Sequence, residues 1–345
     1  MTLIYFILIL GIIVLIHEFG HFIFAKRAGI YVYEFSIGMG PRIFKWTRKN
    51  DETEYSIRLI PIGGFVQMAG EEIDDDESVP KDKKFCVKSF GQKFMTVIAG
   101  IMNNFILAIV LFFVIALING APENKVIVSD VSKDYPAYTS GLQKGDQILK
   151  LNGKNASSYD LLALELQVNN GKEISLEVSR NGEIKTVSLL PKKVNVDGQK
   201  VYKYGFGISD NVKKGVIPSI VYAFSKTFIL IWQMILMIVY LITGHLGLNS
   251  LAGPVGIYSI VDSASSAGIL SLLSLTALLS LNVGFINLLP IPAFDGGRLL
   301  FVIVEKIKGK PVDPKFENTV HAIGFFLLMA LMLFITYNDI IRVFK

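Results

Sequence analysis

The sequence predicts an α-helical integral membrane protein that carries one small α+β domain between its transmembrane helices. Of its 345 residues, 52% are hydrophobic and only 18% are charged, whereas about 25% of the residues in an average soluble domain are charged. The mean hydropathy is +0.50, and the apolar residues form long uninterrupted runs. A more polar stretch, residues 121–210, separates these runs and alternates between apolar and polar residues as β-strands do.

Four segments are long and apolar enough to cross a bilayer. They cover residues 3–25, 94–118, 269–289 and 320–337, and each approaches the ~20 residues that span a ~30 Å hydrocarbon core. No Lys or Arg precedes Lys26, so the first segment lacks the basic start of a secretory signal peptide. We therefore predict four transmembrane helices, two within residues 1–120 and two within residues 251–345.

Basic residues gather in two loops, which predicts the orientation. The first loop lies between the first two spans and the second between the last two; their lysines and arginine are Lys26, Arg27, Lys83, Lys84, Lys88, Lys93, Lys306, Lys308, Lys310 and Lys315. Because cytoplasmic loops are enriched in such residues, we expect both loops inside and the N-terminus and residues 121–210 outside the cell. The net charge of +5 has this origin, so nucleic acid is not an expected partner. Cys86 is the single cysteine, which excludes an intramolecular disulfide.

Residues 211–250 contain a fifth apolar stretch, 217–243, for which two interpretations exist. Hydropathy alone predicts a span, whereas Lys226, Trp232 and Gln233 are typical of an amphipathic helix at the membrane interface. If the stretch crossed the bilayer, the lysine-rich loop before the last span would lie outside the cell. We therefore predict an interfacial helix, which touches the lipid bilayer without crossing it.

Residues 121–210 are expected to form the extracytoplasmic domain. Strands are predicted at 125–131, 148–152, 174–178 and 184–189, with turns at Asn152-Gly153 and Asn181-Gly182 and a helix at 159–168. A further hairpin at 194–208, turning at Asp197-Gly198, is expected to join this domain to the interfacial helix. The run Gly141–Gly153 resembles the Gly-Leu-x-x-Gly-Asp-x-Ile signature of bacterial PDZ domains. The alternative is a β-rich domain of another kind.

The loop between the first two spans contains two runs with strand character. Residues 33–44 hold Gly38, Gly40 and Pro41, and residues 55–68 have only one charged side chain, Arg58. Such runs favour β-hairpins close to the membrane rather than a solvated loop.

His17-Glu18-Phe19-Gly20-His21 is an H-E-x-x-H motif near the end of the first span. Positions 17 and 21 lie one helical turn apart, so both imidazoles can reach one zinc ion, and Glu18 can act as the general base. Ionisable residues inside a span are costly, by roughly 2.5–3.5 kcal/mol at its centre, and usually belong to a functional site. The alternative, a buried polar cluster at a helix end, gives no reason for this spacing.

A catalytic zinc ion normally has three protein ligands, and Asp295 is the candidate for the third. It follows Pro290 and Pro292, which cannot continue a helix, so the third span should unwind there. Irregular backbone at membrane depth is tolerated only around a protein-lined cavity. The predicted topology brings Asp295 and the two histidines to a similar depth, in the cytoplasmic half of the membrane.

The H-E-F-G-H motif, the run NLLPIPAFDGG and the single PDZ-like domain together resemble the site-2 protease family of intramembrane zinc metalloproteases. More narrowly, they are similar to its bacterial RseP/RasP type, and the resemblance covers essentially the whole chain. Phe294 stands where the family commonly has Leu. The resemblance implies one Zn²⁺ per chain and a place in the bacterial cytoplasmic membrane. The substrates it implies are single-pass membrane proteins, such as anti-sigma factors or signal-peptide remnants.

The resemblance also implies roles for further residues. Asn287 matches an asparagine that holds substrate or the developing oxyanion, and Pro290 and Pro292 match the turn beside it. Gly63 and Gly64 lie in the run that matches a hairpin offered to the unwound substrate, while the PDZ-like domain is expected to contact the substrate ectodomain or C-terminus.

Two other functions are compatible with parts of this pattern. A metal transporter could use the same ligands, and an inactive membrane scaffold could use the PDZ-like domain alone. Neither accounts for the general base together with the inserted domain, so the sequence favours intramembrane proteolysis. His245 and His321 are expected to be membrane-interface residues rather than ligands.

Overall fold

The computed structural model describes residues 1–71, 76–123, 125–196, 199–209, 211–247 and 252–343. The chain divides into two compact units. The helical unit comprises Met1–Leu111 and Leu248–Lys345, and the inserted unit comprises Phe112–Gly247. The helix α2 (Phe90–Asn119) begins in the first unit and ends in the second. Each unit is described by itself.

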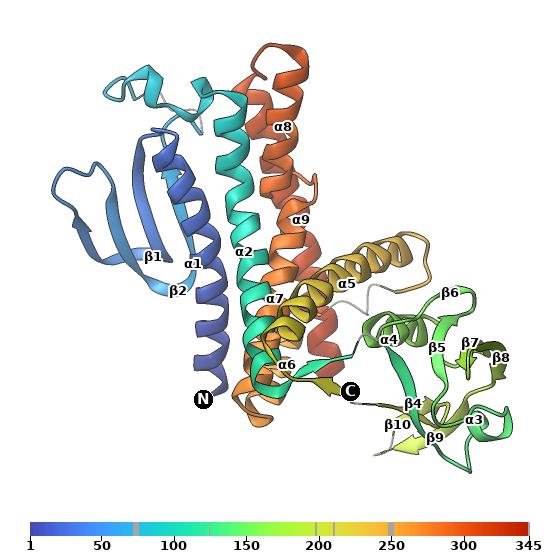
Figure 1. Cartoon of the computed structure of the whole chain (residues 1–345). Helices are drawn as coiled ribbons and strands as arrows, with labels where there is room; N and C mark the ends of the chain where they lie inside the picture. Colours follow the sequence, from blue (N-terminus) through green and yellow to red (C-terminus); the bar gives the residue numbers. More distant parts are fainter. Residues whose placement is uncertain (72–75, 124, 197–198, 210, 248–251, 344–345) are drawn as a thin grey trace. The chain divides into compact units, whose positions relative to one another are not determined.

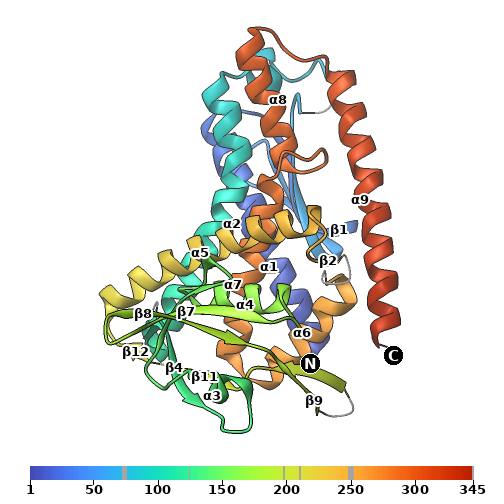
Figure 2. The same cartoon turned by 90° about the vertical axis from the view of Figure 1, so that its right-hand side faces the viewer.

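The helical unit is built from apolar helices. The helices α1 (Thr2–Arg27), α6 (Pro254–Ser266) and α7 (Ile269–Leu288) pack on one another, and Ile13, Val261 and Leu272 are buried between them. Two shorter helical turns, η1 (Lys81–Lys83) and η2 (Phe85–Val87), precede α2. The helix α8 (Asp295–Lys308) follows α7 after a short break, and α9 (Pro314–Val343) runs along the side of the unit (Figure 2).

A twisted sheet lies beside α1 in the same unit (Figure 1). It consists of the long strands β1 (Val32–Thr47) and β2 (Glu54–Met68). The first half of β1 lies between the two halves of β2, since Ser36 is opposite both Ser56 and Phe65. The predicted strand character of this loop is thereby confirmed, with both runs in one sheet, while its position close to the membrane stays a prediction.

Buried charges hold this sheet together. The carboxylate of Glu34 is buried and accepts hydrogen bonds from Arg58 at 2.7 Å and 3.0 Å, and from Arg42 at 3.1 Å. Charged bidentate pairs of this kind are strong and specific in geometry, so they fix the register of the two strands.

The inserted unit is an α+β domain with a six-stranded sheet. Its strands, in spatial order, are β11 (Phe206–Ile208), β4 (Val126–Val131), β5 (Gln147–Leu151), β7 (Ile174–Arg180) and β8 (Glu183–Leu189), with β6 (Lys154–Asn155) paired to β5. The helices α3 (Pro136–Thr139) and α4 (Tyr159–Val168) accompany the sheet. Alternate residues of the strands, such as Ile148, Leu176 and Val178, are fully buried in one apolar core, which is the pattern expected of a sheet with one covered face.

The predicted strands, turns and helix of this domain are confirmed with small shifts in their ends. Asn152, Gly153, Asn181 and Gly182 all have positive φ angles, as two-residue hairpin turns require. Ser158 caps α4 by accepting the Leu161 N–H at 3.3 Å.

One prediction in this region was wrong in part. The expected hairpin at 194–208 exists as β9 (Lys192–Val196) and β10 (Gln199–Lys203), with its turn at Asp197-Gly198 outside the described residues. Its final residues, however, form β11 and pair with β4. Strand β11 is too short to show alternation, so the sequence did not separate it from the hairpin.

The inserted unit also contains α5 (Val216–Ile242) and the short pair β3 (Ala121–Pro122) and β12 (Val212–Lys213). Among the described residues, five helices are long and apolar enough to cross a membrane: α1, α2, α5, α7 and α9. The four predicted spans are among them. Length and composition alone do not distinguish α5 from these four, so its interfacial placement stays a prediction. The helices α6 and α8 were not predicted.

Candidate metal centre

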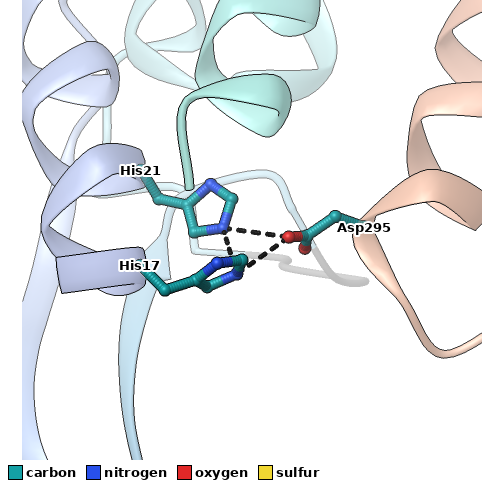
Figure 3. Close-up of side chains that lie close together, drawn as sticks. All are labelled: His17, His21 and Asp295. Atoms are coloured by element: carbon teal, nitrogen blue, oxygen red, sulfur yellow. Dashed lines mark hydrogen bonds and ion pairs between the residues drawn. The ribbon is translucent and has the colours of Figure 1, made fainter. Parts of the chain in front are cut away.

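Three ligand-type side chains from distant parts of the sequence converge inside the helical unit. Asp295 Oδ2 lies 2.9 Å from His17 Nε2 and 3.3 Å from His21 Nε2, and the two imidazole nitrogens are 3.2 Å apart. Figure 3 shows the three side chains pointing toward one another, the histidines from α1 and the aspartate from the start of α8. The structure thus brings together the three residues predicted as ligands, and within the described chain they form the one such group.

The spacing of the three atoms fits a tetrahedral zinc ion. Zinc binds His nitrogen and carboxylate oxygen at about 2.0–2.2 Å, which places the ligand atoms of a tetrahedron roughly 3.3–3.5 Å apart. The observed separations of 2.9 Å, 3.2 Å and 3.3 Å are close to this range. Both histidines are buried, at 6% and 8% exposure. Unpaired nitrogens facing each other at this distance would be unfavourable in an apolar interior, whereas a shared cation makes the arrangement stable.

Side chains and carbonyls of α2 orient both imidazoles. His21 Nδ1 donates to the Thr96 carbonyl at 2.8 Å, which leaves Nε2 without a proton and free to bind a metal. The Asn104 amide lies 3.2 Å from His17 Nδ1 and is fully buried. The atom at this distance is the amide nitrogen Nδ2, and Asn104 Oδ1 is buried without a hydrogen-bond partner among the described residues. A half-turn of the amide gives Oδ1 a donor, because His17 then donates from Nδ1 and presents a bare Nε2. Partners of this kind fix the tautomer and the ring plane of metal-bound histidines.

Two glycines make room for this arrangement. A Cβ atom on Gly100 would lie 2.3 Å from His21 Nε2, and one on Gly20 would lie 2.4 Å from the Ala99 carbonyl oxygen. Small residues let membrane helices approach closely. Here the close approach of α1 and α2 brings Thr96 and Asn104 within reach of the histidines.

The break between α7 and α8 presents Asp295. Helix α7 ends at Leu288 and α8 starts at Asp295, so the predicted unwinding at Pro290 and Pro292 is confirmed. The following glycines pack on the turn itself: a Cβ on Gly296 would lie 2.2 Å from the Leu289 carbonyl oxygen. Only glycine permits so tight a return of the backbone.

Glu18 lies between the metal centre and the sheet. Its carboxylate lies near the Val66 backbone N–H, and Gly64 faces its side chain, since a Cβ there would lie 3.5 Å from Glu18 Cγ. The final segment of β2 therefore has one edge paired with β1 and the other directed at Glu18. Gly63 has a φ of 91° and packs on Met39.

The remaining predicted residues do not belong to the group formed by His17, His21 and Asp295. Asn287 is half-buried in the last turn of α7, and its side chain makes no hydrogen bond within the described part of the chain. His245 lies in the inserted unit and contacts Thr243. His321 does not join the metal group, but it hydrogen-bonds the Ala293 N–H, a contact that its prediction as an interface residue missed.

The chain is similar to known proteins over nearly its whole length. Residues 5–331 match peptidase family M50. The zinc metalloprotease RasP of Oceanobacillus iheyensis is 34% identical over 99% of both chains, and that of Geobacillus kaustophilus is 32% identical over 99% of this chain and 98% of the relative. A putative zinc metalloprotease of Staphylococcus aureus is 37% identical over 99% of both chains. The solved PDZ domain of an SdrC-like protein from Listeria monocytogenes aligns with 26% of this chain and 90% of its own length, at 18% identity and a TM-score of 0.22.

Proposed function

The chain belongs to peptidase family M50, and on that premise we propose that it cleaves transmembrane segments at a zinc centre held by His17, His21 and Asp295. As a member of this family it is a multi-pass membrane protein and a zinc metalloprotease of the site-2 type. The observation that carries the proposed site is the convergence of the three ligand atoms within 4.8 Å of one another.

In the proposed mechanism, His17, His21 and Asp295 would hold a Zn²⁺ ion, which when bound would supply a Lewis acid for the scissile carbonyl and lower the pKa of water. Glu18 takes the proton of the attacking water on its carboxylate and later delivers it to the leaving amine. Asn287 donates from its side-chain amide to the oxyanion that develops on the scissile carbonyl. The Thr96 carbonyl keeps His21 in the tautomer that binds metal, and Asn104 does the same for His17 when its amide oxygen faces Nδ1.

The proposed substrate is a single-pass membrane protein whose helix opens next to the β1–β2 sheet. A peptide bond within a helix is protected by its own hydrogen bonds, so the helix must unwind before attack. The edge of β2 near Gly64 that does not pair with β1 supports this idea, because an added strand there would satisfy the backbone groups of the unwound substrate. That edge faces Glu18, which places a paired substrate beside the general base.

The inserted unit is proposed to contact the extracytoplasmic end of the substrate. Between α4 and β11 lies a groove of about 570 Å³, whose lining includes Leu162 and Leu166 of α4 and residues Gly205–Ile208. Strand β11 is an edge of the sheet, so an extended peptide, such as a free C-terminus, could pair with it and place a side chain in the apolar part of the groove.

We place the inserted unit on the extracytoplasmic side, with α5 at the membrane interface and the active site in the cytoplasmic half. The contacts of α5 support this placement. Its Lys226 pairs with Asp160 of α4 at 2.7 Å, and its Tyr240 donates to the buried Glu165. Phe224, Phe228 and Trp232 are exposed. A helix with a protein-bound polar face and an exposed aromatic face suits the boundary between lipid and water.

Reconstitution tests this proposal. The purified full chain should bind one zinc ion and cleave a single-pass model protein in liposomes, while chelation should stop cleavage and added Zn²⁺ should restore it. His17→Ala should lose both zinc and cleavage, and His245→Ala should keep both. Metal transport into the liposomes without any cleavage would contradict the proposal and favour a transporter. Cleavage that survives complete removal of zinc would also contradict it.

A further inference from the structure

The turn before Asp295 contains a strained residue. Ala293 has a φ of 79°, in the left-handed region that residues with a side chain rarely adopt and that favours glycine. It is one of four non-glycine residues with positive φ among the described residues, and the other three are asparagines, which tolerate this conformation better. Such a conformation persists only where the surroundings impose it.

His321 on α9 provides that constraint. Its Nδ1 accepts the Ala293 backbone N–H at 2.9 Å. Because Nδ1 accepts, the neutral ring must carry its proton on Nε2. Nε2 is buried without a hydrogen-bond partner among the described residues and lies 3.9 Å from Glu317 Oε1. The ring of Phe301 on α8 packs against the imidazole with centroids 5.6 Å apart. The imidazole is therefore fixed between two helices with its acceptor directed at the turn.

A glycine one turn further along α9 completes the contact. A Cβ on Gly324 would lie 2.5 Å from Pro292 Cβ and 2.6 Å from the Pro292 carbonyl oxygen, so only glycine lets the helix come this close. His321 and Gly324 are three residues apart and share one helix face. Together they hold Pro292 and Ala293 against α9, although most of α9 is exposed.

The position of Asp295 depends on this turn. Asp295 is the first residue of α8, and the preceding Phe294 caps the helix without a side-chain hydrogen bond. The backbone between Ile291 and Phe294 therefore decides where the carboxylate points. The two histidines, in contrast, sit within a continuous helix. Asp295 is thus the proposed ligand that follows a non-helical turn, which is closed by the Phe294 N–H on the Ile291 carbonyl at 3.2 Å and held from outside by His321.

We propose that His321 is a positioning residue: by accepting the Ala293 N–H, it holds the turn that directs Asp295 toward His17 and His21. This inference rests on the proposed metal site. His321 does not bind the metal or touch the substrate, and its effect reaches the centre through the backbone of residues 293–295. The acceptor atom of its side chain is what matters, rather than its bulk or charge.

Two substitutions at position 321 distinguish the role of the acceptor atom from that of side-chain bulk. His321→Asn keeps an acceptor, Oδ1, close to the position of Nδ1, whereas His321→Leu keeps apolar bulk and removes the acceptor. For the purified full-length chain, we expect His321→Leu to weaken zinc binding by about 10-fold, at the lower end of the effect of removing an outer partner of a ligand. His321→Asn should recover most of that affinity. The absorption spectrum of Co²⁺ bound in place of zinc should change for His321→Leu and stay near the parent spectrum for His321→Asn.

A further variant addresses the strain directly and leaves α9 unchanged. Glycine adopts a positive φ without cost, so Ala293→Gly should make the turn depend less on His321. The double variant Ala293→Gly/His321→Leu should then bind zinc more tightly than His321→Leu alone. His245→Leu, at an exposed histidine of the inserted unit, is the matched control and should match the parent.

The outcomes distinguish this inference from the proposed function. If the parent binds no zinc and His17→Ala makes no difference, the proposed metal site itself is wrong. If the parent binds zinc and His321→Leu binds it equally well with the same cobalt spectrum, only the role of His321 is overturned. The same conclusion follows if His321→Asn is as defective as His321→Leu, or if Ala293→Gly gives no recovery.

Discussion

The helical unit and the inserted unit both bury polar side chains, but they use them differently. In the helical unit, the buried His17 and His21 direct polar atoms toward one centre, where they meet Asp295. In the inserted unit, the buried Asp146 accepts two hydrogen bonds from Arg180 at 2.7 Å and one from the Gln143 N–H at 2.9 Å. The first arrangement gathers ligand-type atoms that could hold a cation, whereas in the second the carboxylate is neutralised by an arginine of the same sheet.

This difference teaches how to interpret a buried charge. A group whose charge is balanced by protein partners stabilises the fold, while a group of ligand atoms without such partners marks a binding centre. The comparison predicts that substitutions in the two units will affect separate properties. Changes at the metal centre should alter zinc binding and catalysis, and changes at Asp146 should alter only the stability of the inserted unit.

The largest expected effect is that of Glu18→Gln. Removing a general base typically lowers a rate by about 10²–10⁴-fold, so we expect cleavage of a model substrate to fall by about 10³-fold. Zinc content should stay at the parent level, because Glu18 is not one of the three converging ligands. Cleavage rates with purified protein, beside zinc analysis of the same sample, measure both quantities. Glu183→Gln, at an exposed position of the inserted unit, is the control. Near-parent activity in Glu18→Gln would refute its role.

Arg180→Leu should have the next largest effect, confined to the inserted unit. It leaves the Asp146 carboxylate buried without its cationic partner, and breaking a buried pair in this way costs about 3 kcal/mol or more. Native-state hydrogen exchange of the full chain should show faster local opening of β5 and β7, with unchanged zinc affinity.

Lys150→Leu provides the matched control for this prediction. It removes an exposed ion pair with Glu177 on the same two strands and should cost less than about 1 kcal/mol. If Arg180→Leu were equally mild, or if it released zinc, the proposed division between the two units would fail.

Asn104→Leu should act on the metal centre more moderately. Loss of a partner that orients a ligand usually weakens metal binding by about 10–100-fold, and we expect about 10-fold here because His17 keeps its helix position. Competition with a chromophoric chelator measures the affinity. Asn103→Leu is a close control, because Asn103 donates to the Ile16 carbonyl rather than to a ligand, so it should change stability more than zinc affinity.

The smallest effect is a pH dependence of the inserted unit. Burial raises the pKa of Asp146, but hydrogen bonds from Arg180 and the Gln143 N–H outweigh it and hold the pKa below its usual value. A lowered pKa in the folded state means that the unfolded chain binds the proton more readily. The stabilisation is therefore complete above the ordinary carboxyl pKa, near 3.9, and is lost as the pH falls through the lower folded value.

This pH effect can be measured by hydrogen exchange across acidic pH, corrected for the intrinsic exchange rate. Opening of the inserted unit should become easier below about pH 4, and Asp146→Asn should remove this part of the pH dependence. Equal pH profiles for the parent and Asp146→Asn would show that the pair contributes nothing to it.

Much of this organisation follows from local sequence signals. The H-E-x-x-H spacing predicts two ligands because a single helix fixes their relation, and Pro290 and Pro292 predict the break that precedes Asp295. In the inserted unit, alternation predicts the long strands and Asn-Gly predicts the turns. Each of these features is encoded within a few neighbouring residues.

The contacts that were missed depend on how separate elements pack. Thr96, Gly100 and Asn104 lie on an apolar helix whose rotation relative to α1 cannot be determined from its own sequence. His321 acts through a backbone N–H, which no side-chain pattern reveals. Strand β11 is defined by its partner β4 and not by its own three residues.

Mapping the cut in a single-pass substrate tests the central claim most directly. The parent chain, reconstituted with zinc, should produce fragments whose new ends, determined by mass spectrometry, lie within the transmembrane segment. These ends should disappear with Glu18→Gln and with chelation. A cut confined to the soluble parts of the substrate, or the same intramembrane cut from Glu18→Gln, would contradict the account.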